Sequence, residues 1–473
     1  MHTNIVWFRN DLRTYDNAAL FHACNNSNAI VIGVFFITRL QWKIHYLSDK
    51  KIDFILCSVM DLKKTLSKLN IPLYIINGQD YYNSVKHLIQ FSIKYKARCI
   101  FYNNEYEFNE KKRDFYANEK LLKKNITVKN FDGNLIYPIN TIVNKKNNTY
   151  KSFFHFKKKI ISKLLYNEIY CFPSPDIRPY SFINEDDNNL FKYKNNKFKN
   201  IFFKIGEKYA LNKLKNFCEK KISSYSYERN FPFMISTSML SPYLSLGIIT
   251  SKQCLFKIRN IFFNWLNPNS DCFTWINEII WREFYKNLIA GYPLLSKGLA
   301  LRDWEKKIKW NNNMKYFQAW KQGKTGFPII DAGMRQLNTT GWMHNRLRML
   351  TANFLIKNLF IDWRKGEQYF MSQLIDGDFA LNNGGWQWCA SVGTDNVSYI
   401  RHFNPILQSK KIDPKGIFIK KYVPELKNIA EKKIHNPYEW NQNLFNQLKY
   451  PIPIIEISSI KKKITLFFNK VKY

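Results

Sequence analysis

The chain has 473 residues, and its 73 Lys and Arg against 36 Asp and Glu give a formal net charge of +37. With 45% hydrophobic and 23% charged residues, the composition is globular, which excludes a disordered or collagen-like chain. At about 150 residues per domain, the length predicts two or three domains. Part of the charge reflects a general Lys- and Asn-rich composition. The remainder indicates a polyanionic partner, with nucleic acid favoured over a membrane surface.

The sequence lacks the apolar segments that are typical of a membrane or secreted protein. The longest apolar run, residues 29–37, is far shorter than the ~20 residues that cross a bilayer, so we expect no membrane helix. Arg9 and Asp11 follow the first apolar segment and no small-residue cleavage site is present, which favours a cytoplasmic protein over a secreted one. Eight scattered cysteines without a CxxC pair predict reduced structural thiols and no metal site.

Short apolar runs alternate with amphipathic segments in the first 130 residues. Seven apolar residues between 52 and 69 recur at helical spacing between the second and third runs. This order predicts a parallel α/β sheet with right-handed crossovers. No GxGxxG follows any run, so the fold is expected to be Rossmann-like without the dinucleotide fingerprint. The predicted strands are residues 5–8, 30–37, 73–76, 99–102 and 126–128.

The patterning changes after this segment. Between about 130 and 200 it weakens, and prolines and a polar segment at 184–200 indicate a long connector. From about 205 to 440 apolar residues recur with a period near 3.6, which predicts a largely helical second half. The last 30 residues, with a basic run at 461–463, are expected to form a surface helix or tail. We therefore expect an α/β domain at 1–132, a linker at 133–203 and an all-α domain at 204–473.

The helical half contains an unusual polar and aromatic face at residues 275–285. Glu278, Trp281, Arg282 and Tyr285 stand at i, i+3, i+4 and i+7 and so share one face of a helix. Spacing alone favours an interface stripe with a salt bridge. The alternative is a site that stacks an aromatic ligand on Trp281 while Glu278 hydrogen-bonds the edge of that ligand.

Three further segments are candidates either for ligand binding or for an ordinary structural role. Residues 340–349 place two arginines beside Asn and Trp, which suits a phosphate, and the lone His344 is more typical of a core histidine than of a catalyst. Residues 376–388 form a Gly-rich polar segment without EF-hand spacing, in which 383–385 are expected to form a turn. The hydroxyls of residues 237–247 can bind phosphate near a helix N-terminus or can simply cap the helix.

Together these four segments resemble the DNA photolyase and cryptochrome family, and most of all its class I bacterial enzymes that repair cyclobutane pyrimidine dimers. VWFRNDLR at 6–13, KTGFP at 324–328 and DAGMR at 331–335 also match, and weaker similarity spans nearly the whole chain. The resemblance implies an α/β antenna domain, an all-α FAD-binding domain, and a carbon–carbon lyase driven by blue light that flips the dimer out of DNA. It further implies FAD and a methenyltetrahydrofolate antenna, and a monomer with no membrane or obligate protein partner.

The resemblance also implies roles for individual residues. Asn382 would lie at flavin N5, where a neutral amide favours the reduced flavin, and Glu278 would hydrogen-bond the lesion and stabilise its radical anion. The matching FAD positions are Tyr225, Thr237, Ser238, Met239, Leu240, Ser241, Arg282, Arg348, Asp376, Asp378 and Asn382. The matching substrate and DNA positions are Glu278, Trp281, Asn345, Arg346, Met349 and Trp388.

The same resemblance implies two more groups of residues, a chain of tryptophans and a folate-binding site. Trp386, Trp363 and Trp310 match the chain of tryptophans along which the family photoreduces oxidised flavin. The folate antenna would contact Asn109, Glu110 and Lys297, with His45 nearby.

Two other functions share some of these features. A blue-light receptor on the same scaffold would use flavin photoreduction to change a partner surface, but Asn382 and Glu278 count against it. A general single-strand-binding protein would use basic grooves and exposed aromatics, but it leaves Glu278, Asp376 and Asp378 unexplained. Asn345 and Met349 stand where members that repair (6-4) photoproducts carry histidines, which argues against that substrate.

Overall fold

The computed structural model describes residues 2–25, 28–179, 203–394, 401–439, 448–458 and 460–472. Packing divides the chain into two compact units. The first unit is Met1–Ser223 with Ser238–Lys297, and the second is Ser224–Thr237 with Gly298–Tyr473. None of the helices in the described ranges has the length and apolar character needed to cross a membrane.

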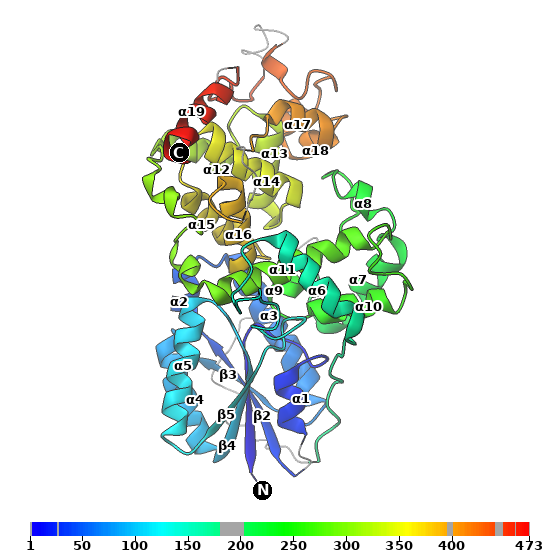
Figure 1. Ribbon diagram of the computed structural model, residues 1–473, viewed down its shortest axis with the longest axis vertical. Helices are drawn as coiled ribbons and strands as arrows, with labels where there is room; N and C mark the ends of the chain where they lie inside the picture. Colours follow the sequence, from blue (N-terminus) through cyan, green and yellow to red (C-terminus); the bar gives the residue numbers. More distant parts are fainter. Residues whose placement is uncertain are drawn as a thin grey trace. The chain divides into compact units, whose positions relative to one another are not determined.

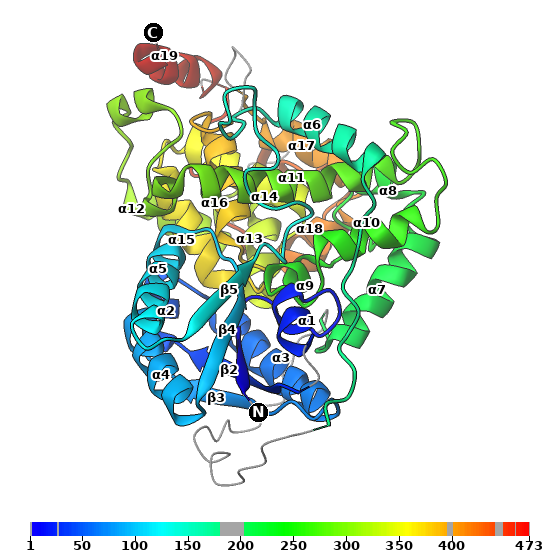
Figure 2. The same ribbon diagram turned by 60° about the horizontal axis from the view of Figure 1, so that its bottom comes forward.

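The first unit is built on a parallel sheet with the strand order β3-β2-β1-β4-β5 (Figure 1). Helices α1 and α3 cover one face and α4 and α5 cover the other (Figures 1 and 2). Because both faces are covered, the central strands β1, β2 and β4 are rich in buried apolar residues, which is why apolar runs revealed them. All five predicted strands are confirmed. They are β1 Thr3–Phe8, β2 Ile30–Ile37, β3 Leu73–Asn77, β4 Ala97–Asn103 and β5 Thr127–Phe131.

The helices of the first unit include the periodic segment predicted after the second strand, which forms α3. Ser48 caps that helix by accepting a hydrogen bond from the backbone N–H of Lys51. The helices are α1 Ala18–Cys24, α2 Arg39–Ile44, α3 Asp49–Ser67, α4 Tyr81–Lys94, α5 Phe108–Leu122, α6 Phe153–Tyr166, α7 Glu207–Lys220, α9 Ser241–Ser245, α10 Ser251–Arg259, α11 Phe273–Gly291 and the 3-10 helix η2 Pro293–Lys297.

Helix α6 lies within the segment that is predicted as a long connector between about 130 and 200. Phe156, Ile160 and Leu164 recur every fourth residue, are buried, and form the face with which α6 packs on α11. Lysines and exposed apolar residues such as Phe154 and Leu165 interrupt this stripe, which weakens its helical pattern in the sequence. The polar segment at 184–200 lies outside the described residues.

The second unit is largely helical in its described residues, as predicted, and the last of its helices is α19. Its elements are α8 Tyr225–Glu228, η3 Asp303–Lys307, α12 Met314–Gln322, α13 Pro328–Thr340, α14 Asn345–Asn353, the π-helical turn η4 Phe354–Asn358, α15 Trp363–Gln373, α16 Phe379–Ala390, α17 Pro405–Ile412, α18 Ile417–Tyr422, η5 Pro424–Leu426, η6 Pro437–Glu439 and α19 Ile460–Lys472.

The KTGFP and DAGMR motifs form the start of α13. The buried carboxylate of Asp331 accepts hydrogen bonds from the backbone N–H and the hydroxyl of Thr325, both at 2.7 Å. It also accepts the backbone N–H of Gly326 at 3.0 Å. These motifs therefore tie the loop at 324–328 to the first turn of α13.

The prediction of a turn at 383–385 is wrong, because these residues lie inside α16. The Asn383 amide donates to the Glu367 carboxyl of α15 at 2.8 Å and accepts from Gln387, one turn along α16, at 2.8 Å. Packing on α15 thus overrides the turn preference of the Asn-Gly-Gly sequence.

No disulfide joins any of the eight cysteines, all of which lie in the described residues. Seven of them are buried and Cys57 is half-buried.

Candidate functional site

The face predicted on residues 275–285 is present on α11 in the first unit. Glu278, Trp281 and Tyr285 are half-buried, and the rings of Trp281 and Tyr285 lie 5.5 Å apart with their planes 29° apart. Phe153 of α6 stacks on Trp281, with ring centroids 3.5 Å apart and planes 6° apart. One indole face is therefore covered by Phe153, and an aromatic ligand can pack only on the other face or at the edge.

Arg282 of the same helix is buried and fixes the end of α9. Its guanidinium donates to the carbonyl oxygen of Leu244 at 2.8 Å. The segment before α9 has Met239 at a positive φ of 50° and Leu240 at the N-cap. The N-cap position of α9 is thus occupied by a leucine, which has no side-chain acceptor, and not by Ser238 or Ser241. The interpretation of these hydroxyls as a simple helix cap is therefore wrong.

In the second unit, Arg348 of α14 pairs with Asp376. The guanidinium donates to Asp376 Oδ2 at 2.7 Å and to the carbonyl oxygen of Met343 at 2.8 Å. Asp376 is only 5% exposed, and its other oxygen, Oδ1, is buried with no hydrogen-bond partner among the described residues. The hydroxyl of Ser236, beside Thr237, is buried in the same unsatisfied state. Such atoms are costly unless a ligand supplies the missing hydrogen bonds.

Asp378 and Asn382 lie at the start of α16. Asp378 caps the helix by accepting from the backbone N–H of Leu381, and the Asn382 amide donates to the carbonyl oxygen of Glu367 at 3.0 Å. Burial raises the pKa of Glu367 to about 7. The Asn382 amide is thus held by the backbone carbonyl of Glu367, whereas the buried carboxyl group of Glu367 accepts from Asn383. Tyr225, on α8, is buried beneath the guanidinium of Arg229.

Helix α14 presents the predicted substrate residues on one side. Asn345 Nδ2 lies 3.7 Å from Met349 Sδ, one turn away, which confirms that the two residues are neighbours. Arg346 donates to the Asn230 side chain at 3.0 Å. His344 is the N-cap of the helix, and burial lowers its pKa to about 3, so it is a neutral structural residue. Trp388 on α16 is half-buried with the Arg401 guanidinium 5.2 Å from its ring centroid.

The three predicted relay tryptophans all lie in the second unit. Trp363 and Trp386 are buried and Trp310 is half-buried. A Cβ at Gly366 would collide with the Trp386 ring, so Trp386 packs on α15 one turn from Trp363. The indole N–H of Trp310 donates to Glu305, which is bound to Arg364, the residue after Trp363. Helix α15, which carries Trp363, is therefore in contact with Trp386 at Gly366 and is linked to Trp310 through Arg364 and Glu305.

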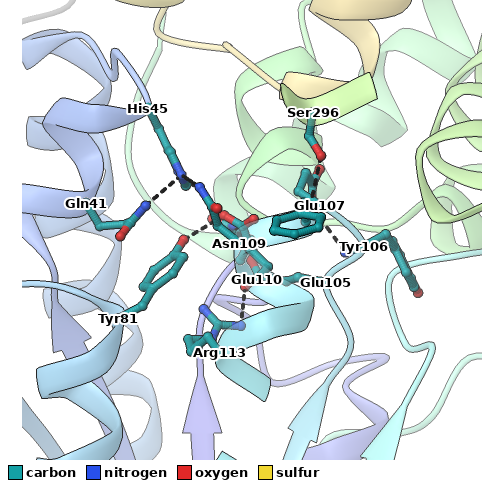
Figure 3. A network of polar contacts seen from close by, with 12 residues as sticks. Gln41, His45, Tyr81, Glu105, Tyr106, Glu107, Asn109, Glu110, Arg113 and Ser296 are labelled. Atoms are coloured by element: carbon teal, nitrogen blue, oxygen red, sulfur yellow. Dashed lines mark hydrogen bonds and ion pairs between the residues drawn. The ribbon is translucent and has the colours of Figure 1, made fainter. Parts of the chain in front are cut away.

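His45, Asn109 and Glu110 of the predicted antenna site come together in the first unit (Figure 3), and Lys297 binds Asn109. The amide nitrogens of Gln41 and Asn109 each lie 2.8 Å from Nε2 of His45, at the end of α2. Lys297 of η2 donates to Asn109 Oδ1 at 2.7 Å. The Tyr81 hydroxyl of α4 donates to the Glu110 carboxyl of α5 at 2.7 Å.

The protonation states of this cluster are unusual. Burial, together with the negative charges of Glu107 and Glu105, raises the pKa of Glu110 to about 8. Burial also lowers the pKa of His45. At neutral pH the cluster therefore presents a protonated carboxyl, a neutral imidazole, an amide and an ammonium group. This is a mixed donor and acceptor set suited to a heteroaromatic ring with an anionic tail.

Comparisons with known proteins identify the class. The family model for DNA photolyase matches residues 4–176, and the model for the FAD binding domain of DNA photolyase matches residues 275–469. A deoxyribodipyrimidine photo-lyase of Buchnera aphidicola is 49% identical over 100% of this chain and 98% of its own length. That of Escherichia coli is 41% identical over 96% of both chains. The chain belongs to the DNA photolyase family.

Solved structures agree with this assignment. A bacterial class III photolyase from Agrobacterium tumefaciens has a TM-score of 0.82 and 30% identity, covering 100% of this chain and 98% of its own. An archaeal photolyase from Sulfolobus tokodaii, described with two FAD molecules, has a TM-score of 0.80 and 30% identity, covering 99% of this chain and 100% of its own.

Sequence reasoning missed several residues that the structure places against these sites. Phe153, Tyr81 and Glu367 lie on other elements than the residues they contact, and Glu305 contacts Trp310, five residues away. No local spacing signals such contacts. The one available signal was the apolar stripe of α6, which would have located Phe153 at the start of a helix.

Proposed function

We propose that this chain repairs cyclobutane pyrimidine dimers in DNA, using light and FAD. When bound and reduced, FAD supplies the electron that opens the cyclobutane ring. The observation that carries the proposal is the buried Asp376 oxygen without a partner, next to the Arg348 ion pair, in a chain of the photolyase family. An acceptor and a cation held at one place match the polar edge and ribityl chain of a flavin.

The FAD ligands divide by chemistry. Arg282 and the hydroxyls of Thr237, Ser238 and Ser241 suit the diphosphate, together with the backbone at Met239 and Leu240. Arg348, Asp376 and Asp378 suit the isoalloxazine edge and ribityl groups, and Tyr225 supplies a further contact. Asn382, held by the Glu367 carbonyl, would present its neutral amide to flavin N5. The protein orients the cofactor, which does the difficult chemistry.

The dimer and its DNA would be held by a second group of residues. Glu278 hydrogen-bonds the dimer and stabilises the negative charge that it gains. Trp281 packs on one flipped base with the indole face opposite Phe153, and Trp388 packs on the other base. Asn345 and Met349, neighbours on α14, line the pocket, and Arg346 contacts the DNA backbone.

A DNA repair assay tests this function. An oligonucleotide with one thymine dimer is incubated with the FAD-loaded, chemically reduced protein, and intact dimers are counted after blue light or darkness. Loss of the dimer under light alone is expected. Loss in darkness, or persistence under light with reduced flavin bound, would contradict the proposal.

We also propose that His45, Asn109, Glu110 and Lys297 hold a methenyltetrahydrofolate antenna. The protonated Glu110 and the amide of Asn109 suit the pterin edge, and the Lys297 ammonium suits the glutamate tail. Binding is measured by near-UV absorbance after mixing with the folate. Lys297→Ala should weaken it, whereas Lys112→Ala, on α5 but outside the cluster, should not. Equal binding by both variants would remove Lys297 from the site.

The remaining assignments concern assembly and domains. The chain works as a cytoplasmic monomer without an obligate protein partner, and the eight unpaired cysteines fit a reducing compartment. Its proposed sequence domains are the α/β antenna domain at 1–132, the linker at 133–203 and the all-α FAD-binding domain at 204–473. Light scattering of the purified protein, with and without DNA, tests the monomer; a stable dimer would contradict it.

A further inference from the structure

The two oxygens of the Glu110 carboxyl group lie in different environments. Glu110 is only 7% exposed, and it belongs to the polar cluster shown in Figure 3. Its Oε1 oxygen receives the Tyr81 hydroxyl of α4 at 2.7 Å and lies 3.5 Å from Nδ1 of His45. Its Oε2 oxygen forms no hydrogen bond with any of the described residues. Oε2 is therefore the oxygen left for a ligand.

A chain of contacts that starts at Lys297 fixes the hydrogen positions around Glu110. An ammonium group can only donate, so Lys297 holds Asn109 Oδ1 as an acceptor at 2.7 Å. The other end of this amide, Nδ2, must then donate to Nε2 of His45, at 2.8 Å. A ring nitrogen that accepts carries no hydrogen, so His45 is neutral and its hydrogen lies on Nδ1, which faces Glu110 Oε1. Burial lowers the pKa of His45, which agrees with the neutral form.

These contacts decide where a proton on Glu110 resides. Oε1 receives the hydroxyl of Tyr81 and faces the N–H of His45, so a proton on Oε1 would meet a second hydrogen. A proton on Oε2 meets no donor among the described residues. A protonated Glu110 therefore carries its hydrogen on Oε2 and donates from that oxygen.

The surroundings of Glu110 favour this protonated form. No lysine or arginine of the described residues forms an ion pair with it. Arg113 of the same helix is bound to Glu105 at 2.8 Å, and Lys286 of α11 is bound to Glu107 at 3.2 Å. Burial and the charges of Glu107 and Glu105 outweigh the opposing charge of Arg113 and raise the pKa of Glu110 to about 8.

We propose that Glu110 binds the antenna pigment as a hydrogen-bond donor from Oε2, and that Tyr81 is the positioning residue that holds the carboxyl group in this orientation. This inference rests on the folate site proposed above. The pigment atom at Oε2 is then an acceptor, such as the carbonyl oxygen or a ring nitrogen of a pterin.

This role predicts a dependence on pH. An ionised Glu110 has no hydrogen to donate, so binding should weaken as the pH rises through the pKa of Glu110. The titratable and charged groups that face Glu110 are His45 of α2, Tyr81 of α4, Lys297 of η2, and Glu105, Glu107 and Arg113 in and before α5.

Folate binding at two pH values tests the inference. The FAD-loaded protein is mixed with methenyltetrahydrofolate at pH 6.5 and pH 8.5, and the near-UV absorbance of the bound pigment is recorded at once. The native affinity should be about fourfold lower at pH 8.5, the ratio expected when only the protonated form of a group with a pKa of about 8 binds. Glu110→Gln carries an amide N–H in place of the Oε2 hydrogen at both pH values, so its affinity should not change between them. Loss of free pigment affects both proteins equally, because they are measured in the same solutions.

Tyr81→Phe removes the hydroxyl that holds Oε1 and keeps the ring. Its affinity at pH 6.5 should fall by about two- to fivefold, because the carboxyl group loses one of its two fixed contacts. The further weakening at pH 8.5 should be smaller than in the native chain, because the hydrogen bond from Tyr81 lowers the pKa of Glu110. Tyr82→Phe is the matched control, since Tyr82 follows on α4 but is 53% exposed, and it should keep the native affinity at both pH values. Native behaviour of Tyr81→Phe would overturn the role of Tyr81.

Infrared spectra of the FAD-loaded protein without folate give a second measurement. The native spectrum minus that of Glu110→Gln should show a protonated carboxyl band at pH 6.5 that weakens at pH 8.5. Absence of this band, or native folate binding that strengthens at pH 8.5, would mean that Glu110 acts as an acceptor and would overturn the inference. Native folate binding of equal affinity at both pH values would defeat this inference alone. Failure of the native protein to bind folate at either pH would defeat the antenna proposal and this inference together.

Discussion

Phe153 and Trp281 form a parallel ring pair, with centroids 3.5 Å apart and planes 6° apart, between the first residue of α6 and the middle of α11. Phe153 also meets Phe284 edge-on at 5.7 Å, so it is held from two directions. The pair restricts the orientation of the indole before any ligand arrives. An indole held in this way loses less conformational entropy when a base stacks on its free face.

Removing this support should weaken lesion binding. We expect Phe153→Ala to reduce affinity for dimer-containing DNA by about two- to tenfold, because an aromatic pair is worth ~0.5–1.5 kcal/mol beyond burial. Titration of a fluorescent oligonucleotide that contains the dimer measures this affinity, and FAD absorbance serves as the check on folding. The neighbouring Phe154→Ala is the control, because Phe154 is 70% exposed. Tighter binding by Phe153→Ala would mean that Phe153 covers the substrate face instead.

The relay has a direct test at its first member. Trp386→Phe should slow flavin photoreduction by at least about tenfold, while repair by pre-reduced protein stays close to normal. Steady-state bleaching of oxidised flavin under blue light measures the first quantity, and the dimer assay measures the second. Trp320 also meets the Trp386 ring, at 6.1 Å, but is not a proposed relay member. Trp320→Phe should therefore keep photoreduction, and equal loss in both variants would place Trp320 on the route.

Glu278 should act on the dimer and not on the flavin. For Glu278→Ala we expect repair per absorbed photon to fall several-fold. The dimer loses its hydrogen bond with the Glu278 carboxyl group, which stabilises the negative charge that the dimer gains. FAD content, read from the visible spectrum, should match that of the native chain. Loss of FAD in this variant would instead make Glu278 a cofactor contact.

Glu367 should make stability depend on pH. Its pKa is raised by burial to about 7, so the folded state binds a proton that the unfolded state releases near pH 4.5. The contribution of Glu367 to stability is therefore fully present below pH 4.5 and is lost as pH rises to about 7. Glu367→Gln keeps the acceptor for Asn383 and should stabilise the protein at pH 8 by up to about 3 kcal/mol.

Denaturant unfolding at pH 5 and pH 8 measures this difference. Because other buried acids also titrate, the quantity of interest is the gap between the native chain and Glu367→Gln, which should widen at the higher pH. Substitution of the exposed Glu119 serves as the control and should produce no such change. A constant gap across pH would mean that Glu367 is ionised throughout.

Much of this protein was predictable from the sequence because the signals are local. Short apolar runs marked all five strands, since the inner strands of a parallel sheet covered on both faces are rich in apolar residues. The spacing of Glu278, Trp281 and Tyr285 placed them on one face of α11 because the helical repeat is a property of neighbouring residues. The motifs at 324–328 and 331–335 likewise form one local structure around Asp331.

Tertiary packing decided what periodicity could not express. The Asn383-Gly384-Gly385 turn became helix because Glu367, 16 residues away, binds Asn383. The raised pKa of Glu367 and the unsatisfied oxygen of Asp376 arise from burial by several elements at once. The contact of Glu305 with Trp310 is short in sequence, but the bidentate ion pair of Glu305 joins it to Arg364, 59 residues away. Sequence pattern determines which face a residue occupies, whereas only the packed chain determines which charges, rings and orphaned atoms face each other.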